Sequence, residues 1–594
     1  MCGIFGFTGK QKNIGALCFN ALKQLEYRGY DSWGVAIYGE NLEVVKKIGK
    51  LPMSYPEFKA GSMALGHTRW ATHGGVTITN AHPHVGNNKR AVVAHNGIVE
   101  NYLELKNVLE KSNCCFQSET DTEIIVQLYE KIRTSLDPLP SFIKTISQLS
   151  GNNAVVIMDL ETKTLLATKN GSPMVIGKSN FGSFIASDVA PLLGHCDLIY
   201  YVENNEILVA SETRVQIYDS LSSSYKEPDW IKPDMTLSQV ELGSYPHYLI
   251  KEICEQPEIL RNISLSKAPE LKSMRHFISS GSDLWFTGCG TAFYACLLAT
   301  YIAARKGITA RAVYAHELPM LLGQLNNNSR VIALSQSGET IDVIDAITMA
   351  KAKNIKTGAL VNVTTSSLSR IVDCSLPVHA GPEICVLSTK AFTAMVSNLF
   401  ALFETDYSIA SSLLKAANAI EYMLKDDTLS EIDDIAHFLC MKQSIFIVGT
   451  GEYYPLAMEA ALKIKEVSYI HAEAFPSGEL KHGVIALIEE GTPCIVFAPD
   501  NNTEEKNGDN SNRNDSRERI KIHASEIRAR GGKIISLSPK KLSPEDVHIK
   551  VDFDGIAYFF AALAAIQLLA YKCALIKNLD PDKPRNLAKS VTVR

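Results

Sequence analysis

The sequence predicts a layered α+β domain followed by two α/β units with parallel sheets. Residues 1 to about 220 carry short β-type runs separated by Gly, Asn and Asp turns, whereas apolar strands, glycine turns and helices alternate beyond about residue 275. The second pattern occurs twice, because 283–290 and 444–451 are similar apolar runs that each end in a glycine turn, 161 positions apart. Two tandem units are the simplest explanation of such a repeat.

The composition sets the size of these domains and the classes of partner. At 594 residues, with 46% hydrophobic and 21% charged side chains, the chain can form several buried cores and is not a disordered protein. Its 59 basic and 64 acidic side chains give a net charge of -5. This balance excludes a general attraction to nucleic acid or to anionic membranes, so any bound anion must be held by a local site.

The cysteines and the apolar segments predict a cytoplasmic protein. The 13 cysteines include no CxxC pair, which is typical of free thiols in a reducing compartment. The first residues have no basic region followed by a long apolar run, so no signal peptide is expected. The apolar run 556–571 is shorter than the roughly 20 residues that a membrane helix needs, and it predicts a buried helix.

Short patterns predict the elements in order. In the first domain the expected strands are 35–38, 90–94, 154–158, 165–167 and 207–210, and the expected helices are 101–111 and 122–133. The polar stretch 220–239 is expected to be an interdomain linker. In the α/β units further strands are expected at 330–335 and 492–498. The Asn-rich stretch 500–519 is expected to be a solvated surface insertion.

Cys2 is the first residue with evident chemistry. Removal of Met1 would place its thiol on the terminal residue, beside an α-amino group with a pKa of about 7.7–8.0. Such an amine can act as the base that activates a nucleophile. Taken alone, Cys2 would be interpreted as an ordinary apolar cysteine, and it is the neighbouring motifs that favour a nucleophile.

Five ordered motifs contain those neighbours. They are the segments 2–6, 27–32, 67–74, 95–97 and 119–122. Together they resemble the N-terminal-nucleophile glutamine amidotransferase domain, which implies an αββα architecture. The resemblance implies that Cys2 attacks the side-chain amide of glutamine, forming a γ-glutamyl thioester and releasing ammonia. The Asn96 amide and the Gly97 N–H would form the oxyanion hole.

The same resemblance assigns the glutamine-binding residues. They are Arg69, Trp70, Thr72, His73, Gly74 and Asp121. Arg69 would clamp the α-carboxylate, Asp121 would bind the α-ammonium group, and Trp70 would gate a path for ammonia. Read locally, Arg69 and Asp121 could instead be a structural ion pair, and 96–97 could be a hairpin turn.

Four histidines near this segment raise the question of a metal site. His73, His82, His84 and His95 are close in sequence, but no carboxylate or thiol stands at ligand spacing beside them. We therefore expect no metal.

In the second half, the glycine turns do not predict a dinucleotide cofactor. Phe293 and Tyr454 stand where GxGxxG requires its third glycine. The stretch 335–340, Ser-Gln-Ser-Gly-Glu-Thr, instead follows an apolar strand and opens a helix. Hydroxyls and free N–H groups at a helix N-terminus can bind a phosphate monoester, although a serine-rich helix cap would look the same.

Segments 288–291, 335–340 and 388–390 together resemble the sugar-isomerase (SIS) domain. The resemblance implies that a sugar phosphate is held by Thr291, Ser335, Gln336, Ser337 and Thr340. It assigns sugar contacts to Val386 and Ser388. Ala292 stands where the family often has Ser, which puts one phosphate contact in doubt. The second copy has Pro-Asp-Asn-Asn at 499–502 in place of the serine loop, so no phosphate is expected there.

The second copy offers charged residues instead. Glu459, Lys463 and Glu466 lie four and three positions apart, so they share one helix face, as an ordinary exposed salt-bridged helix would also allow. The domain order and the tail 584–594 resemble, across nearly the whole chain, the family of isomerising glutamine–fructose-6-phosphate aminotransferases, also called glucosamine-6-phosphate synthases. That resemblance implies glutamine and fructose 6-phosphate as substrates, no cofactor, and channelling of ammonia between the two sites.

It also assigns roles in the sugar site. Lys589 would form a Schiff base with carbon 2 of the open-chain ketose, with Ala588 beside it in contact with the sugar. Glu466 would move the proton between carbons 1 and 2. His482 would assist ring opening from the partner subunit of a homodimer. Lys463 and Glu459 would complete the site.

The expected domain boundaries follow from these assignments. They are 2–219 for the glutaminase domain, 220–274 for a linker and connecting helix, 275–414 and 436–580 for the SIS domains, and 581–594 for a catalytic tail. Amidophosphoribosyltransferase and asparagine synthase share the first domain, but they need a phosphoribosyl or ATP site that the second half lacks. A sugar-phosphate sensor or a deglycase remains the alternative, and neither requires Cys2, Glu466, His482 and Lys589 together.

Overall fold

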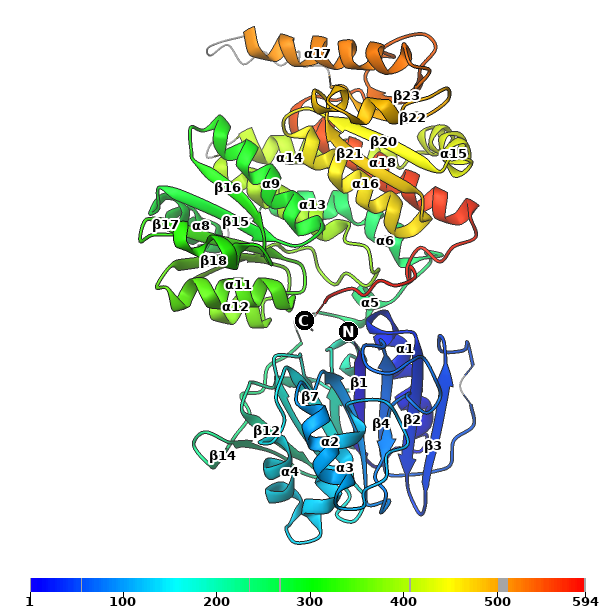
Figure 1. The fold of residues 1–594 in the computed structure, drawn as a ribbon, viewed down its shortest axis with the longest axis vertical. Coiled ribbons are helices and arrows are strands. Elements are labelled where there is room, and N and C mark those ends of the chain that lie inside the picture. The colour runs from blue at the N-terminus through cyan, green and yellow to red at the C-terminus, as the bar shows by residue number, and fades with distance from the viewer. Residues whose placement is uncertain are drawn as a thin grey trace. The chain divides into compact units, whose positions relative to one another are not determined.

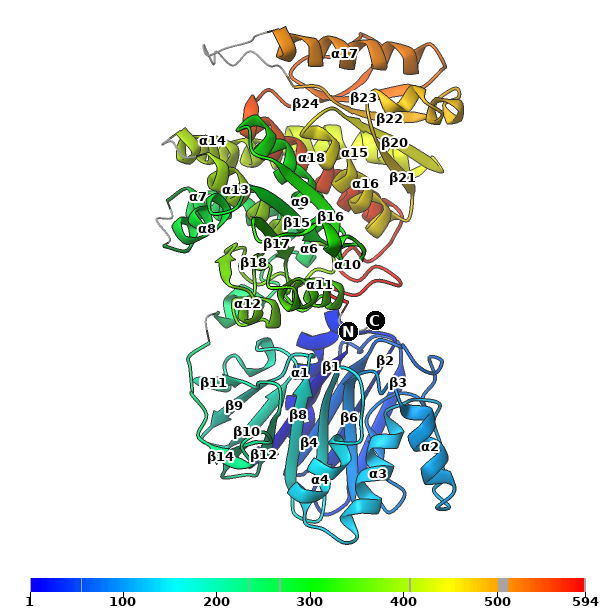
Figure 2. The ribbon, with the colours of Figure 1, turned by 60° about the vertical axis from the view of Figure 1, so that its left-hand side comes forward.

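The computed structural model describes residues 2–54, 56–233, 235–265, 269–404, 408–499 and 511–591, the side chains of 511–517 excepted. The chain divides into two compact units (Figures 1 and 2). Unit 1 contains the chain up to residue 241 together with 339–341 and the residues from 588 onwards. Unit 2 contains 242–338 and 342–587.

Unit 1 is built on two seven-stranded antiparallel sheets. The first sheet has the order β11 (Leu198–Tyr201), β9 (Val175–Ser179), β10 (Gly182–Ala186), β1 (Gly3–Gly9), β4 (Met63–Arg69), β2 (Ser32–Tyr38) and β3 (Leu42–Ile48). The second has the order β14 (Ser224–Lys226), β13 (Val215–Asp219), β12 (Glu206–Ala210), β8 (Thr164–Asn170), β7 (Asn153–Asp159), β6 (Ala91–Gly97) and β5 (His84–Val85). Apolar side chains of both sheets form one buried core between them.

Helices cover the outer faces and complete the αββα layers. Helix α1 (Ile14–Leu25) packs on the first sheet, and α3 (Glu123–Arg133) and α4 (Pro138–Ile146) pack on the second (Figure 2). Helix α2 (Tyr102–Glu110) packs against α3, and the short α5 (Leu237–Val240) follows the sheets. The expected first-domain strands overlap β2, β6, β7, β8 and β12, and the expected helices overlap α2 and α3, so these elements are confirmed with ends that differ by at most three residues.

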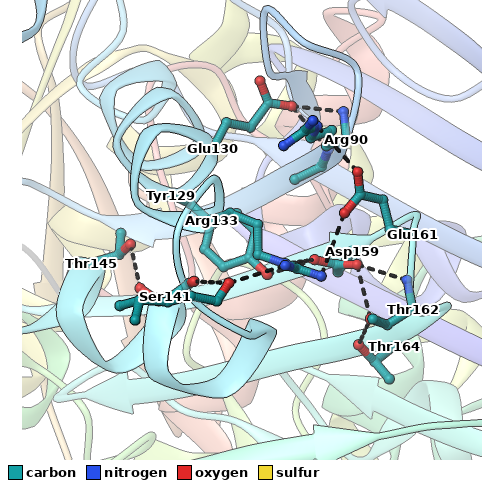
Figure 3. Close-up of polar contacts among 12 residues, drawn as sticks. Arg90, Tyr129, Glu130, Arg133, Ser141, Thr145, Asp159, Glu161, Thr162 and Thr164 are labelled. Atoms are coloured by element: carbon teal, nitrogen blue, oxygen red, sulfur yellow. Dashed lines mark hydrogen bonds and ion pairs between the residues drawn. The ribbon is translucent and has the colours of Figure 1, made fainter.

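A buried polar network fastens α3 to the second sheet (Figure 3). The fully buried Asp159, at the end of β7, accepts hydrogen bonds from Tyr129 Oη at 2.7 Å and Arg133 Nε at 3.0 Å. The carboxylate of Glu130 accepts the backbone N–H groups of Arg90 and Ala91 at 2.7 and 3.1 Å. Side chains of one helix therefore satisfy polar groups at the start of β6 and the end of β7, which keeps the layers in register.

The polar stretch 220–239, expected to be a linker, is in part paired with strands of unit 1. Residues Ser224–Lys226 form β14, which pairs antiparallel with β13, and Ile231 forms a bridge with Ile199. The sheet therefore continues past residue 219, because main-chain pairing needs no apolar sequence when the strand is exposed on the edge.

Unit 2 contains two five-stranded parallel sheets with the same topology. The first sheet has the order β16 (Ala310–Tyr314), β15 (Asp283–Gly288), β17 (Ser329–Ser335), β18 (Lys356–Val361) and β19 (Cys374–Pro377). The second has the order β21 (His471–Pro476), β20 (Ser444–Gly449), β22 (Pro493–Phe497), β23 (Lys533–Ser538) and β24 (Val547–Lys550). Numbered within each half, both orders are 2-1-3-4-5, so the tandem repeat predicted from the glycine turns is confirmed.

Helices surround and join these sheets. They are α6 (Tyr248–Cys254), α7 (Gln256–Leu265), α8 (Pro269–Ser279), α9 (Thr291–Arg305), α10 (Leu318–Leu321), α11 (Ile341–Ala352), α12 (Ser367–Ile371), α13 (Lys390–Phe403), α14 (Ser408–Met423), α15 (Asp426–Cys440), α16 (Tyr453–Ser468), α17 (Ser511–Arg528) and α18 (Gly555–Ile576). One large apolar cluster contains side chains of both sheets and of the helices between them.

Helix α18 lies at the centre of that cluster. It is long and apolar enough to span a membrane by length and composition, but 83% of its most apolar window is buried, and it packs against α14, α15 and α16. The buried helix predicted for 556–571 is confirmed.

The prediction of a solvated surface insertion at 500–519 is partly wrong. Residues 500–510 lie outside the described part of the chain, but the stretch from Ser511 belongs to α17. Ile520, Ala524 and Ile527 of this helix are buried against the second parallel sheet. This apolar face begins just after residue 519, so a window ending there contains none of the contacts that hold the helix.

Candidate functional site

In unit 1, Cys2 is held by the main chain of Trp70. The Trp70 N–H donates to Cys2 Sγ at 3.2 Å, and the thiol donates to the Trp70 carbonyl at 3.5 Å. Burial raises the pKa of the Cys2 thiol, while the Trp70 N–H and the nearby Arg69 and Arg28 guanidinium groups act in the opposite direction. The thiol is therefore protonated at neutral pH and needs a base before it can act as a nucleophile.

Asn96 and Gly97 lie beside Cys2, at the end of β6. Asn96 Nδ2 donates to the Cys2 carbonyl at 2.9 Å and to Ser187 Oγ at 2.8 Å. Gly97 has a φ of +130°, and a Cβ there would stand 2.0 Å from the Asn152 carbonyl oxygen. Only glycine fits this backbone, so the Asn96–Gly97 pair is a constrained strand end and not a free hairpin turn.

Arg69 organises the loop after β4. Its guanidinium donates to the carbonyl oxygens of His73, Gly74 and Gly75 at 2.6, 3.0 and 3.1 Å. Burial lowers the pKa of Arg69, and the opposing charges of Cys2, Asp31 and Asp121 partly offset that shift. Among the described residues, these loop carbonyls are the hydrogen-bond partners of Arg69, and it forms no ion pair with Asp121.

The other predicted glutamine residues lie around this loop. The Trp70 ring packs edge-on against Tyr30 with centroids 5.9 Å apart, and the His73 ring packs edge-on against Tyr102 at 5.3 Å. Thr72 is exposed. Asp121 is buried, and its carboxylate accepts the Val99 N–H at 2.7 Å.

Several residues that position this site were not assigned a role from the sequence. Arg28 Nε donates to the Cys2 carbonyl at 3.2 Å, and Asp31 accepts the Ala71 N–H at 2.8 Å. Both lie in the motif 27–32, so their motif was recognised but their contacts were not. Ser187 Oγ accepts the Ile4 N–H at 2.8 Å and the Asn96 amide, and no sequence pattern marks it.

The buried histidines form a cluster of rings. The rings of His67 and His82 lie 4.2 Å apart, and those of His82 and His84 lie 4.8 Å apart. Burial lowers the pKa of His67 to about 3 and holds the pKa values of His82 and His84 well below their usual range. Within the described residues, no group of three or more His, Cys, Asp or Glu side chains could hold a metal ion.

In unit 2, the predicted phosphate loop lies at the switch point of the first parallel sheet. Strand β15 lies between β16 and β17, so the loops that follow β15 and β17 leave the sheet in opposite directions. Ser335 is buried at the end of β17, and its Oγ accepts the Gly338 N–H at 3.0 Å. Gln336, Ser337 and Thr340 are half-buried.

The three charged residues of α16 meet Thr291 of α9. Lys463 Nζ lies 2.7 Å from Glu466 Oε2, 3.4 Å from Glu459 Oε1 and 3.1 Å from Thr291 Oγ1. The Thr291 hydroxyl donates to Glu459 Oε2 at 2.9 Å. We call these four residues the buried charge cluster; Glu459 and Lys463 are 0% and 1% exposed. An exposed salt-bridged helix is thereby excluded.

Burial determines how this cluster is charged. It raises the pKa of Glu459 to about 7, a shift increased by Glu466 and opposed by Lys463 and Thr291. Burial lowers the pKa of Lys463, but the two carboxylates outweigh it and raise that pKa overall. Lys463 therefore stays an ammonium group, and Glu459 changes its charge near neutral pH.

Val386 and Ser388 lie on a segment fixed by two carboxylates and one main-chain carbonyl. Ser388 Oγ lies 3.3 Å from Glu383 Oε2, and Glu252 accepts the Cys385 N–H at 3.0 Å. The Val386 N–H donates to the carbonyl of Asp582, whose carboxylate caps the start of α6. The beginning of the C-terminal tail is thus bound to the segment that carries the predicted sugar contacts.

The remaining predicted residues come from other segments of the chain. His482 is exposed after a short 3-10 turn, and its N–H bonds to the Glu479 carbonyl at 2.9 Å. Ala588 and Lys589 are half-buried and belong to unit 1. Earlier in the tail, Arg585 lies on the ring of Tyr469, 4.2 Å from its centroid.

Comparison with known proteins gives matches to both halves and to the whole chain. A model of the glutamine amidotransferase domain matches 52–239, and a model of the SIS domain matches 277–405 and 437–547. The glutamine–fructose-6-phosphate aminotransferases (isomerizing) of Pyrobaculum aerophilum and Aquifex aeolicus are 35% and 36% identical, over 100% of each chain. The C-terminal domain of glucosamine-fructose-6-phosphate aminotransferase from Francisella tularensis covers 57% of this chain and 99% of its own, with a TM-score of 0.51 and 30% identity.

Proposed function

The chain belongs to the family of isomerising glutamine–fructose-6-phosphate aminotransferases, and from this premise we propose how its two sites share the work. It converts L-glutamine and D-fructose 6-phosphate into L-glutamate and D-glucosamine 6-phosphate. The single observation that carries this conclusion is the match to such enzymes over the full length of both chains.

In the proposed glutaminase step, Cys2 is the nucleophile once the peptide bond to Met1 has been cleaved. Its α-amino group takes the thiol proton, Sγ adds to the side-chain carbonyl of glutamine, and the oxyanion is held by Asn96 Nδ2 and the Gly97 N–H. The amide nitrogen receives the proton and leaves as ammonia, and water then hydrolyses the thioester to glutamate. The raised pKa of the buried thiol supports the need for the amine as base.

Glutamine is proposed to lie against the loop that Arg69 organises. Arg69 and Asp121 bind its α-carboxylate and α-ammonium groups, and Trp70, Thr72 and His73 line its side. The three carbonyl contacts of Arg69 support this assignment, because they fix the guanidinium plane while leaving N–H groups for a substrate.

In the proposed sugar step, the serine loop binds the phosphate of fructose 6-phosphate. Its ligands are Ser335, Gln336, Ser337 and Thr340, with Val386 and Ser388 against the sugar. The switch-point position of the loop supports this, since ligands of such sheets bind outside the carboxyl ends of the strands. Because the Thr291 hydroxyl donates to Glu459, its phosphate contact needs a different donor, its backbone N–H.

Lys589 is proposed to form a Schiff base with carbon 2 of the open-chain ketose. Ammonia adds to that carbon and Lys589 leaves as an amine, which gives the imine of the sugar. Glu466 takes a proton from carbon 1 and returns it to carbon 2, and the proton of the carbon-1 hydroxyl passes to the imine nitrogen, which gives the amino aldose. The Lys463 ammonium, 2.7 Å from Glu466 Oε2, supports this role because it fixes the position of the carboxylate.

The organisation of the working enzyme is also proposed. The domains are 2–219, extended through β14, then the SIS domains 275–414 and 436–580 and the tail 581–594, with 227–274 connecting the halves. Ammonia passes between the sites without release, in a cytoplasmic homodimer in which His482 acts across the interface and Ala588 touches the sugar. The exposed position of His482 supports a role toward a second chain.

One coupled assay tests the division of labour. Glucosamine 6-phosphate is measured with glutamine or with ammonium salt as the nitrogen donor. We expect Cys2→Ala to lose synthesis from glutamine and to keep synthesis from ammonia, and Lys589→Arg to lose both while keeping part of the glutamine hydrolysis. Full glutamine-dependent synthesis by Cys2→Ala would show that the nucleophile is assigned wrongly.

A further inference from the structure

His67, a buried histidine of β4, contacts Asn96, and the glutaminase chemistry described above does not use this contact. We propose that His67 is a positioning residue that fixes the orientation of the Asn96 amide for the reaction at Cys2. This inference rests on the proposed function, in which Asn96 stabilises the oxyanion.

His67 reaches Asn96 across the core of unit 1. It lies on β4, opposite Ile4 of β1 on one side and Gly34 of β2 on the other, in the first sheet. Asn96 lies on β6 of the second sheet, opposite Ala154 of β7. The His67 side chain is fully buried, and its Nε2 lies 3.1 Å from the His95 carbonyl oxygen and 3.2 Å from Asn96 Oδ1.

The His95 carbonyl, His67, Asn96 and the Cys2 carbonyl form a series of hydrogen bonds, and the carbonyl at each end of this series can only accept. The His95 carbonyl oxygen cannot donate, so His67 Nε2 must carry the proton that it shares with Asn96. The Cys2 carbonyl oxygen cannot donate either, so the Asn96 group 2.9 Å away must be the NH₂ group. The two ends therefore agree on one amide orientation, with Oδ1 toward His67 and Nδ2 toward Cys2.

The surroundings of His67 keep this arrangement in place. Burial, aided by the charge of Arg69 and opposed by the hydrogen bonds to the His95 carbonyl and Asn96, lowers the pKa of its ring to about 3, so the ring is neutral and carries a single proton. Nδ1 has no hydrogen-bond partner among the described residues, which leaves Nε2 as the nitrogen with something to donate to. The ring of His82 packs on it at 4.2 Å and limits its rotation.

The contact matters when the oxyanion forms. Both Nδ2 hydrogens of Asn96 are engaged in this structure, with the Cys2 carbonyl and with Ser187 Oγ, so one of them must turn toward the new charge. Arg28 Nε continues to satisfy the Cys2 carbonyl when that happens. The bond from His67 permits this small turn but opposes a full flip, which would aim Oδ1 at the oxyanion, and it strengthens the amide as a donor.

The test compares His67→Gln with His67→Met in the full-length enzyme. The two side chains are similar in length, but only glutamine carries an N–H that can reach Asn96. We expect His67→Met to lower kcat for glutamine hydrolysis by about tenfold to a hundredfold, and His67→Gln to recover most of it, with KM for glutamine within about twofold in both. His84→Met is the matched control and should keep kcat within about threefold, because His84 is a buried histidine of the same cluster that bonds Thr120 and contacts neither Asn96 nor the His67 ring.

Two further readouts separate positioning from general damage to the site. Alkylation of Cys2 by iodoacetamide forms no oxyanion, so its rate should be the same in His67→Met and the unaltered enzyme. Asn96→Ala should lower kcat by about a hundredfold or more, and His67→Met added to it should cause no further loss. If the two losses instead multiply, or if alkylation falls as much as kcat, His67 does not act through Asn96.

The outcomes also distinguish this inference from the proposed function. Multiplying losses overturn the role of His67 and leave Cys2 and Asn96 as assigned. Full activity of Asn96→Ala overturns the oxyanion assignment and the His67 role together. Glutamine hydrolysis by Cys2→Ala overturns the proposed nucleophile itself, whatever the result at His67.

Discussion

Replacing Glu459 by glutamine should remove a pH-dependent loss of stability from unit 2. Burial raises the pKa of Glu459 from 4.5 to about 7, so the folded protein holds a proton that the unfolded chain releases at lower pH. Stability from this group is present in full below about pH 4.5 and is lost as the pH rises to about 7. The full loss is about 3 kcal/mol, and about 2 kcal/mol of it falls between pH 5.5 and 8.5.

Hydrogen exchange of α16 measures this loss locally. The opening free energy of its amides is obtained at pH 5.5 and 8.5 for the unaltered protein and for Glu459→Gln. The unaltered protein should lose about 2 kcal/mol more than the variant over this range. Glu452→Gln removes a carboxylate at the start of the same helix, where it pairs with Arg305 at 2.6 Å, and is the matched control.

An equal change in the unaltered protein and in Glu459→Gln would refute the reasoning. It would mean that Glu459 keeps the same charge throughout the range, and that Lys463 compensates its burial completely. A larger loss of stability in Glu459→Gln than in the unaltered protein would also refute the reasoning. A raised pKa of Glu459 requires the unaltered protein to lose more stability than the variant as the pH rises.

Three further results are expected. Gly97→Ala should abolish glutamine hydrolysis, because its Cβ would meet a carbonyl oxygen at 2.0 Å, whereas Gly49→Ala, also at positive φ but with nothing within 4 Å, should cost only about 1 kcal/mol in a thermal unfolding assay. Asp159→Ala should lower the free energy of unfolding of unit 1 by about 3–5 kcal/mol in urea titrations, because it leaves Arg133 without its buried partner. Lys463→Met should reduce synthesis of glucosamine 6-phosphate at least a hundredfold and leave glutamine hydrolysis intact in the coupled assay, because two carboxylates lose their shared ammonium group.

Local patterns predicted much of the fold and part of the site. Glycine turns after apolar runs predicted the tandem sheets, because parallel strands buried on both faces have near-continuous apolar sequences. The spacing of Glu459, Lys463 and Glu466 predicted one helix face, because that relation is set by the helix alone. Their burial could not be predicted, since it depends on α9 and α18 packing over them.

Contacts between distant segments could not be predicted either, because they also depend on how other elements pack. Thr291 and Glu459 are 168 positions apart, and Ser187 is 91 positions from Asn96. Single hydroxyl groups of this kind leave no periodic signal, and only the assembled sheets bring them to their partners. The β14 strand was missed because an exposed edge strand pairs through its main chain, whatever its side chains.

The common strand order of the two halves of unit 2 has a consequence for how this enzyme can arise and fail. A duplicated fold ordinarily yields two sites of the same kind, yet here the serine loop is on one copy and the helix with Glu459, Lys463 and Glu466 is on the other. A chain whose synthesis stops before Tyr453 would contain the complete first copy and still leave the Thr291 hydroxyl without Glu459 and Lys463. Neither copy is a smaller version of the whole, so truncation removes the synthesis of glucosamine 6-phosphate and does not leave a weaker synthase.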